Sequence, residues 1–461
     1  MIGTAARRPY DPRYDPLTDP DPGTNRDYAP TYWIATAGTA PPDDGPLSRD
    51  DETDVVVIGS GYTGLSCAIH LARDFGIRPV VLEANGVAWG CSTRNGGQAQ
   101  ISAGRLKRSG WIARWGLATA QAMHAEVAEA FELFRSLLEE AEIDCDPRRG
   151  GHLHIAHRQR SLEQLETESR LLNEVFHYPS RLLSAEQLRR EHVDDHEAHG
   201  AMFEPDGVGI HAAKLAFGYL RLARRLGARV HTASPVLAWE VLGGSHRLRT
   251  PGGTIRARAV AIATGGYTPP SLHALTRHRL LPVLSNSIVT RPLTSAEWSS
   301  CGFRSDAFYT DTRTLRHYYR SLPDRRVQIG SRSSITGADA TNPRHLQRLR
   351  ESLARKFPAL ADIKIDYSWW GWVDVSHDLM PRIFQPDPAQ TVYYALAYGG
   401  NGVMYSAQAG RRLAQLAARR GTLPQLPIFH SPLPGRGVLR PFRRMGQRIL
   451  YAWYHARDEA S

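Results

Sequence analysis

Three glycines and one acidic residue form the pattern in this sequence that most clearly indicates chemistry. Gly59, Gly61 and Gly64 have the spacing G-x-G-x-x-G, and Glu83 follows 19 residues after the last of them. In this spacing the first glycine permits a tight turn, the second lets backbone approach a pyrophosphate, and the third lets a helix pack closely on a strand. The carboxylate of Glu83 would accept hydrogen bonds from an adenosine ribose. The set predicts an adenine dinucleotide site that disfavours NADP, because a 2′-phosphate would meet like charge.

The neighbouring segments supply the elements that must position these residues. Residues 55–58 are apolar and predict a short buried parallel strand, and residues 79–82 predict the next one. Between them, Leu65, Ile69 and Leu71 give a helix an apolar face. Because strand, glycines, helix, strand and acid stand in the expected order, we interpret the stretch as a Rossmann unit rather than as a glycine-rich turn without a ligand. These residues alone leave FAD and NAD open.

The rest of the chain predicts a further strand for this sheet and a second domain. Residues 259–263 form a further apolar strand that ends in small residues, which is typical of a parallel sheet beside a nucleotide. Residues 111–142 and 403–419 have helical periodicity, and 280–290, 314–319 and 327–330 are strand-like. We therefore predict an α/β fold in which a Rossmann-type domain is interrupted by an α+β substrate domain with an antiparallel sheet.

Length and composition exclude several classes of protein. At 461 residues two domains are expected. The apolar runs are far shorter than the roughly 20 residues of a membrane span, and no apolar segment follows Arg7-Arg8, so we expect a cytoplasmic protein. The scattered cysteines indicate neither a disulfide framework nor a metal site; they are Cys67, Cys91, Cys145 and Cys301.

The chain is basic, and most of its positive charge is arginine. With 57 basic and 46 acidic residues, its formal charge is +11, which suits an anionic partner. No nucleic-acid-binding module accompanies the charge, so nucleic acid is disfavoured as a partner. Near the end of the chain, a basic amphipathic helix is predicted with an apolar stripe; its residues are Val438, Phe442, Met445, Ile449 and Trp453. Such a helix binds a membrane surface or acidic partner, or packs on its own protein or a second subunit. We favour packing, which leaves a homo-oligomer open.

Motifs along most of the chain resemble those of the D-amino-acid-oxidase-like family of FAD-dependent oxidoreductases, and within it the gamma-glutamylputrescine oxidoreductase branch. The motifs are YWIATA, DVVVIGSGYTGLS, VVLEA, WGCSTRNGGQ, AIATGGYTP, LLPVLSNSIVTRPL, HYYR, IGSR, WWGWVDVSHDLMPRI and YALAYGGNGV. The resemblance implies FAD as the cofactor. It also implies oxidation of the bond between carbon and an amine nitrogen, with oxygen or another acceptor reoxidising the flavin.

Carried over residue by residue, the resemblance implies a set of FAD-binding positions. The pyrophosphate would meet Gly59, Ser60, Gly61, Tyr62, Thr63 and Gly64, and the ribose Glu83 and Ala84. The ribityl and phosphate side would meet Ser92, Arg94, Asn95, Gly96 and Gly97. Val236 would meet adenine through its backbone, and Ala263, Thr264 and Gly265 would close the pocket. The pyrimidine edge of the flavin would meet Gly399, Gly400, Asn401, Gly402 and Val403.

The chain departs from the family's usual residues at three of these motifs. Thr93 replaces a frequent glycine, Asn401 a frequent histidine, and Arg291 an acidic residue. These changes leave the FAD prediction intact and bear on the substrate. We predict the domain boundaries 1–49 for an irregular arm, 50–110, 200–274 and 366–425 for a discontinuous FAD-binding domain, 111–199 and 275–365 for the substrate domain, and 426–461 for the basic tail.

The substrate itself is predicted only as a class. An amino-acid or glutamyl-type substrate needs a partner for its carboxylate, and arginine is the natural one; we name Arg320 and Arg332 as candidates. Trp372, with Trp369 and Trp370, would line an amine pocket by cation–π contact or pack in the core. No catalytic residue is assigned. The alternatives are a flavoenzyme of the same fold acting on a hydroxy acid or natural-product intermediate, an RNA-modification flavoprotein, and a non-catalytic flavoprotein.

Overall fold

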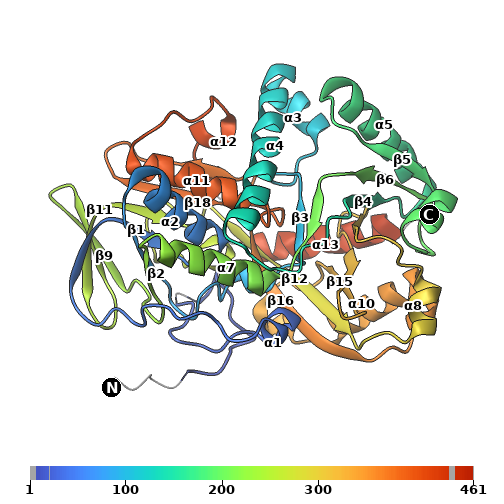
Figure 1. The fold of residues 1–461 in the computed structure, drawn as a ribbon, viewed down its shortest axis with the longest axis horizontal. Helices are drawn as coiled ribbons and strands as arrows, with labels where there is room; N and C mark the ends of the chain where they lie inside the picture. Colours follow the sequence, from blue (N-terminus) through green and yellow to red (C-terminus); the bar gives the residue numbers. More distant parts are fainter. Residues whose placement is uncertain (1–6, 20, 436–441, 460–461) are drawn as a thin grey trace.

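Two large sheets carry the chain in the computed structural model, which describes residues 7–19, 21–435 and 442–459 (Figure 1). Each sheet has eight strands. In the view of Figure 1 the strands of the first sheet lie on the left and those of the second on the right, with α4 (Leu117–Glu140) between them. Within the described residues, no helix is long and apolar enough to cross a membrane.

The first sheet is the predicted Rossmann unit. Its strands, in spatial order, are β17 (Arg382–Phe384), β18 (Val392–Leu396), β11 (Thr254–Ile262), β1 (Asp51–Ile58), β2 (Val80–Leu82) and β8 (Arg229–His231). All neighbours are parallel except β17 and β18. The predicted apolar run of β1 is its buried half, because a central parallel strand is covered on both faces. A hairpin, β9 (Ala238–Leu242) and β10 (Ser245–Arg249), extends from β11.

Helices cover this sheet and bring the glycine turn into place. They are α2 (Tyr62–Phe75), α7 (Ala212–Arg225) and α11 (Tyr405–Ala418). Helix α2 packs on both α7 and α11. The predicted helix over 111–142 is instead two helices, α3 (Arg108–Trp115) and α4, which share Gly116 as their boundary. Gly116 has a φ of +80°, a left-handed backbone that interrupts a helix.

The second sheet is the predicted substrate-domain sheet. Its strands, in spatial order, are β16 (Ile365–Val375), β12 (Leu281–Thr290), β15 (Val327–Ser331), β14 (Tyr318–Ser321), β13 (Phe308–Asp311), β4 (His152–Ile155), β6 (Gly200–Glu204) and β5 (Arg181–Ser184). Neighbours are antiparallel except β13 and β4. Both β6 and β16 pair in this sheet. By the predicted boundaries at 200 and 366, β6 and nearly all of β16 would instead belong to the FAD-binding domain. The accompanying helices are α5 (Gln159–Val175), α6 (Ala185–Glu191), α8 (Ser295–Cys301), α9 (Gly337–Ala340) and α10 (Pro343–Lys356).

The first part of the chain is the predicted irregular arm, with one short helix, α1 (Tyr32–Thr36), docked on the body. Trp33 is buried, and its indole N–H donates to the carbonyl oxygen of Asn95 at 2.8 Å. Further along the arm, the carbonyl oxygens of Pro12 and Tyr14 accept hydrogen bonds from the indoles of Trp370 and Trp372. The arm is therefore held against both sheets.

A buried group of charges links the substrate domain to the last helix, α13 (Arg443–Glu459). The Lys356 ammonium lies 3.1 Å from the Asp195 carboxylate and 3.2 Å from that of Glu197. Arg313 then joins Glu197, at 2.9 Å, to Glu459 of α13, at 3.2 Å. The Lys356 side chain is fully buried. Each charge of this group therefore needs its oppositely charged partners to offset the free-energy cost of burying it. A shorter helix, α12 (Pro427–His430), precedes α13.

Candidate active site

The turn between β1 and α2 forms a cradle that admits no side chains. Gly59 has a φ of +100°, and a Cβ built on it would lie 2.7 Å from the carbonyl oxygen of Ala263. A Cβ on Gly64 would clash with the carbonyl oxygen of Gly59. Gly61 caps the N-terminus of α2 without a side-chain hydrogen bond, which leaves the positive end of the helix facing the turn. This geometry suits a diphosphate.

Glu83 closes the cradle from the end of β2. One carboxylate oxygen accepts hydrogen bonds from the Ser60 backbone N–H and hydroxyl, at 3.0 and 2.8 Å. The other accepts one from the Asn85 N–H at 3.1 Å. Burial raises the pKa of Glu83, and these hydrogen bonds oppose the rise. The carboxylate is thus oriented toward the cavity with acceptor capacity remaining.

The loop after β2 is braced by its own side chains. The Ser92 hydroxyl accepts a hydrogen bond from the Tyr62 N–H at 3.0 Å, and the Asn95 side chain bonds the loop backbone at Cys91 and Ser92. Arg94 is buried, and its guanidinium lies 4.2 Å from the Trp89 ring centroid. The departure at Thr93 is accommodated, because its hydroxyl donates to the carbonyl oxygen of Ala88.

A cavity of about 360 Å³ runs from this cradle to the second sheet. Among the positions implied by the resemblance, its lining includes Gly59, Gly61, Tyr62, Thr63, Glu83, Ala84, Ser92, Arg94, Asn95, Gly96, Val236, Ala263, Thr264, Gly265, Gly400, Asn401, Gly402 and Val403. The other four lie behind the wall and shape it. Ser60 orients Glu83 through a hydrogen bond, and Gly64 lets α2 approach β1. At Gly97 a side chain would clash with the Ile210 carbonyl oxygen. The Gly399 carbonyl accepts a hydrogen bond from Arg332.

The far end of the cavity is formed by the turn before α11. The Asn401 amide donates to the carbonyl oxygen of Gly104. Helix α11 begins at Tyr405, two residues later than predicted, with Met404 as its N-cap and no side-chain cap. The Ser406 N–H already bonds the Gly402 carbonyl at 2.9 Å. The helix therefore points its N-terminal end toward the cavity.

Three arginines from different elements border this end of the cavity: Arg105, Arg316 and Arg332. None of them forms an ion pair with a carboxylate in the part of the chain that the structure describes. An Arg332 N–H donates to the Gly399 carbonyl at 2.7 Å, and the Arg316 Nε is buried without a hydrogen-bond partner. The positive charge of Arg332, burial and the charge of Arg316 together lower the pKa of Arg105 well below its usual value. Burial likewise lowers the pKa of Arg316 and Arg332.

This cluster of cations calls for an anionic ligand. Burying like charges together without a counter-ion is costly, and a carboxylate would provide both charge and bidentate acceptors. Of the three, only Arg332 was a candidate from the sequence. Arg316 lies two residues before Tyr318, which also lines the cavity. Alternate residues of a strand face the same side, so extending the strand pattern back from Tyr318 would predict that Arg316 faces the cavity as well. Arg105 lies in a loop whose spacing gives no such signal.

The structure corrects the other two substrate candidates, since neither Arg320 nor Trp372 lines the cavity. The buried Arg320 guanidinium donates to the carbonyl oxygens of Gly97, at 2.6 Å, and Ile210, at 3.1 Å. Burial lowers its pKa to about 10. The Trp372 indole donates to the Tyr14 carbonyl at 3.0 Å. Both side chains hold other backbone segments: Arg320 lies behind the loop that ends at Gly97, and Trp372 lies under the arm.

We expect Arg320→Met to act on stability rather than on substrate binding. It would leave two buried carbonyls with fewer donors, at a cost of about 1–3 kcal/mol. Thermal unfolding should show a lower midpoint, while the Michaelis constant of the folded enzyme stays near that of the wild type. A selective rise of the Michaelis constant at unchanged stability would return Arg320 to the substrate site.

Comparison with known proteins decides the family. A family model described as FAD dependent oxidoreductase matches residues 54–416. The chain belongs to this family. It is 32% identical over 442 residues to gamma-glutamylputrescine oxidoreductase of Escherichia coli, covering 94% of this chain and 99% of that protein. It is 23% identical over 372 residues to glycine oxidase of Bacillus subtilis, covering 79% and 92%. The solved structure of glycine oxidase from Geobacillus kaustophilus shares the fold, with a TM-score of 0.72 and 20% identity over 83% of this chain and 100% of that one.

The cofactor of this FAD-dependent oxidoreductase is therefore FAD, which confirms the sequence prediction over NAD. The residues present fit it. The glycine cradle has no room for side chains, and the first turn of α2 and the Glu83 carboxylate offer donors and acceptors at the two places where a diphosphate and a ribose need them. The predicted fold class is confirmed by the glycine oxidase structure.

Asp374 is a cavity-lining carboxylate that the sequence analysis did not single out. It accepts a hydrogen bond from the Ala397 N–H at 2.5 Å, and burial raises its pKa to about 6. Its ionised form therefore destabilises the fold. The stability that its protonated form contributes is present below pH 3.8 and is lost as the pH rises through about 6.

We expect Asp374→Asn to remove this loss, because asparagine keeps an acceptor for Ala397 and cannot ionise. The unfolding midpoint of the variant should gain on that of the wild type as the pH rises from 4 to 7. A difference in midpoint that stays constant over this range would show that Asp374 does not titrate there.

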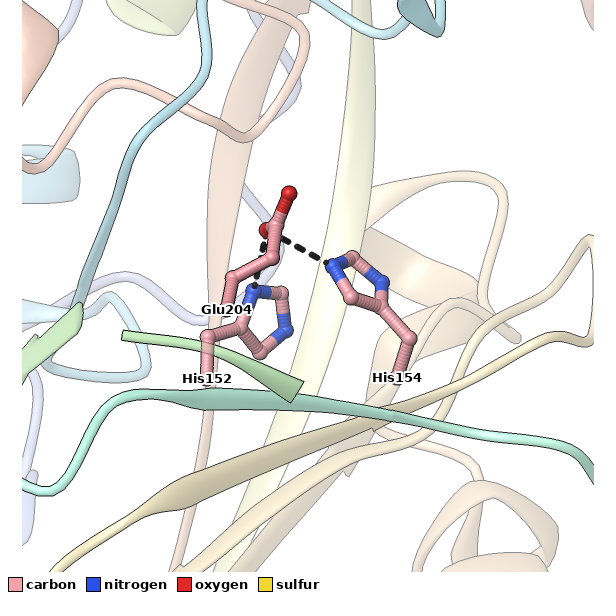
Figure 2. A group of neighbouring side chains, drawn as sticks. All are labelled: His152, His154 and Glu204. Atoms are coloured by element: carbon pink, nitrogen blue, oxygen red, sulfur yellow. Dashed lines mark hydrogen bonds and ion pairs between the residues drawn. The ribbon is translucent and has the colours of Figure 1, made fainter. Parts of the chain in front are cut away.

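Beside the arginines, Glu204 lies between two histidines (Figure 2). Its carboxylate is 3.0 Å from the His154 Nε2 and 3.7 Å from the His152 Nδ1. These three groups could each offer one metal ligand. Arg108, however, lies 3.4 Å from the other carboxylate oxygen, so a positive charge already compensates Glu204. His152 also bonds the hydroxyl of Thr310, which lines the cavity. The group thus supports the cavity wall.

Proposed function

We propose that this oxidoreductase oxidises the carbon–nitrogen bond of a small amine or amino acid that also carries a carboxylate. The observation that carries the proposal is the set of three cavity arginines that, among the described residues, form no ion pair with a carboxylate. Bound FAD supplies the chemistry by accepting a hydride equivalent from the carbon next to nitrogen. The two relatives are named for gamma-glutamylputrescine and glycine, and both compounds contain an amine and a carboxylate.

In this proposal the chain holds the cofactor along the cavity. Gly61 and Thr63, with the first N–H groups of α2, bind the diphosphate, and Glu83 binds the ribose. The turn at Gly400 to Val403 would hold the pyrimidine edge of the flavin, where the N-terminal end of α11 would favour negative charge. The support is that all of these residues border one continuous cavity.

The arginines position the substrate. Arg332 is anchored on the Gly399 carbonyl, so its remaining N–H groups are oriented for a carboxylate. Arg105 and Arg316 complete the positive wall and hold the acid so that its amine-bearing carbon reaches the flavin. No side chain is required to remove a proton from carbon when hydrogen leaves as hydride, and we assign no catalytic base.

Two further features remain proposals. The electron acceptor is oxygen or another oxidant, and the location is the cytoplasm. All four cysteines are free thiols, which is what a reducing compartment maintains. A homo-oligomer stays a prediction.

A substrate screen without oxygen tests the proposal. The holoenzyme is mixed with amines, amino acids and gamma-glutamyl amines, and loss of the visible flavin absorbance is followed. Carboxylate-bearing amines should bleach the flavin, and their methyl esters should do so much more slowly. Bleaching by hydroxy acids alone would favour the second candidate, a same-fold enzyme that oxidises a non-amine carbon. Equal rates for acids and esters would contradict the role of the arginines.

A further inference from the structure

Helix α13 faces the protein with its polar side. Arg444 contacts Asp15 at 2.7 Å and the Pro282 carbonyl at 2.9 Å. At the other end of the helix, the buried Asp458 carboxylate accepts hydrogen bonds from the N–H groups of Thr314 and Leu315, at 2.6 and 3.0 Å. Hydrogen bonds and ion pairs therefore hold the helix at both ends.

The apolar side of α13 and of the residue before it faces outward. Five large apolar side chains are between 47% and 63% exposed: Phe442, Met445, Ile449, Leu450 and Trp453. At 100° per residue they fall on one stripe along the helix. The predicted stripe is thus present. Of the favoured interpretation, packing on its own protein is wrong for these residues, and packing on a second subunit stays a prediction. Val438, the remaining member, lies outside the described residues.

Basic residues line both edges of this stripe. The same helical spacing places Arg448 and His455 along one edge and Arg457 along the other. Of the two acids of the helix, Glu459 pairs with Arg313, whereas the buried Asp458 lies 3.9 Å from Arg457 and offsets part of its charge. An apolar stripe between two basic edges is the arrangement of helices that lie in the interface of an anionic membrane.

We propose that the outer face of α13 docks on the surface of an anionic lipid bilayer, with the helix lying in the plane of the membrane. The stripe would enter the boundary between headgroups and acyl chains, and the arginines would meet lipid phosphates. A second copy of the chain fits this face less well, because pairing two stripes would bring the basic edges of both copies together.

The docked face belongs to the helix that borders the arginine end of the cavity. Tyr451 and Tyr454, on the inner side of α13, lie close enough to Arg105 to influence its pKa. This inference concerns the surface of α13 and does not depend on the identity of the substrate.

The test is sedimentation of the holoenzyme with vesicles of phosphatidylcholine alone or with 30% phosphatidylglycerol. We expect binding to the anionic vesicles only, weakened by salt, and at least tenfold weaker binding for Ile449→Glu. Lipids brominated on their acyl chains should quench part of the tryptophan fluorescence, and Trp453→Leu should remove that quenching while keeping vesicle binding.

The matched control is Leu242→Glu, which places the same charge on a similarly exposed apolar residue of the β9–β10 hairpin. It should bind vesicles like the wild type, and all variants should retain FAD. Absence of binding to anionic vesicles, or equal binding by Ile449→Glu, would overturn the proposal. So would light scattering that shows a dimer which Ile449→Glu converts to a monomer, because the stripe would then be a subunit interface.

Discussion

Replacing Arg332 with alanine is expected to lower the apparent affinity for an acidic substrate at least tenfold. Breaking a buried, charge-assisted pair costs about 2–5 kcal/mol, and each 1.4 kcal/mol corresponds to about a factor of ten. The same change removes a positive charge that lowers the pKa of Arg105. It also removes the donor to the buried Gly399 carbonyl, which has the opposite effect on stability. The unfolding temperature of the empty protein should therefore change little, while its Michaelis constant rises.

Two variants make this result specific. Arg332→Lys keeps the charge but loses the planar fork, and should fall between alanine and wild type. Arg348→Ala removes an exposed arginine of α10 and should change neither quantity. The measurements are steady-state kinetics and thermal unfolding without substrate. Wild-type kinetics in Arg332→Ala on a confirmed acidic substrate would show that the carboxylate binds elsewhere.

The second large effect is expected at Glu83, where Glu83→Arg should abolish retention of FAD. Three donors, the two of Ser60 and the N–H of Asn85, converge on this carboxylate. A guanidinium there would place its N–H groups against these three donors in a buried site. It would also leave the ribose without an acceptor. The ratio of flavin to protein absorbance in the purified variant measures the effect.

Glu83→Gln is the control for this change, since it keeps one acceptor oxygen and adds no charge. It should retain most of the FAD and release it faster on dilution. If Glu83→Arg were purified with one FAD per chain, the ribose would have to be bound by another group.

The dinucleotide half of the site could be predicted because its determinants are local. Gly59 and Gly64 act within one turn, and Glu83 follows at the end of the next strand, so spacing alone carries the geometry. The substrate half could not be predicted in the same way. Arg105 comes from a loop and Arg316 from a turn between strands, and only the tertiary fold brings them beside Arg332.

Strand and helix periodicity also leave the direction of a face undetermined. In β16, Trp370 and Trp372 bond the arm, whereas the alternating Gly371 and Val373 line the cavity. A pattern of period two separates these sets but does not say which one faces the ligand. In the same way, the stripe on α13 was evident from its spacing, but its exposure depends on which face the rest of the protein binds.

If the three cavity arginines bind an acidic substrate, they also link the lifetime of the folded enzyme to the concentration of that substrate. An empty site keeps Arg105, Arg316 and Arg332 in mutual repulsion, and any ligand that binds only the folded chain adds stability that grows with its concentration. An acidic substrate would add more than its binding contacts alone, because it also relieves this repulsion. Unfolding and the proteolysis that follows it should therefore slow when substrate is abundant and quicken when it is exhausted. Cells that consume the substrate would in this way clear the enzyme that they no longer need.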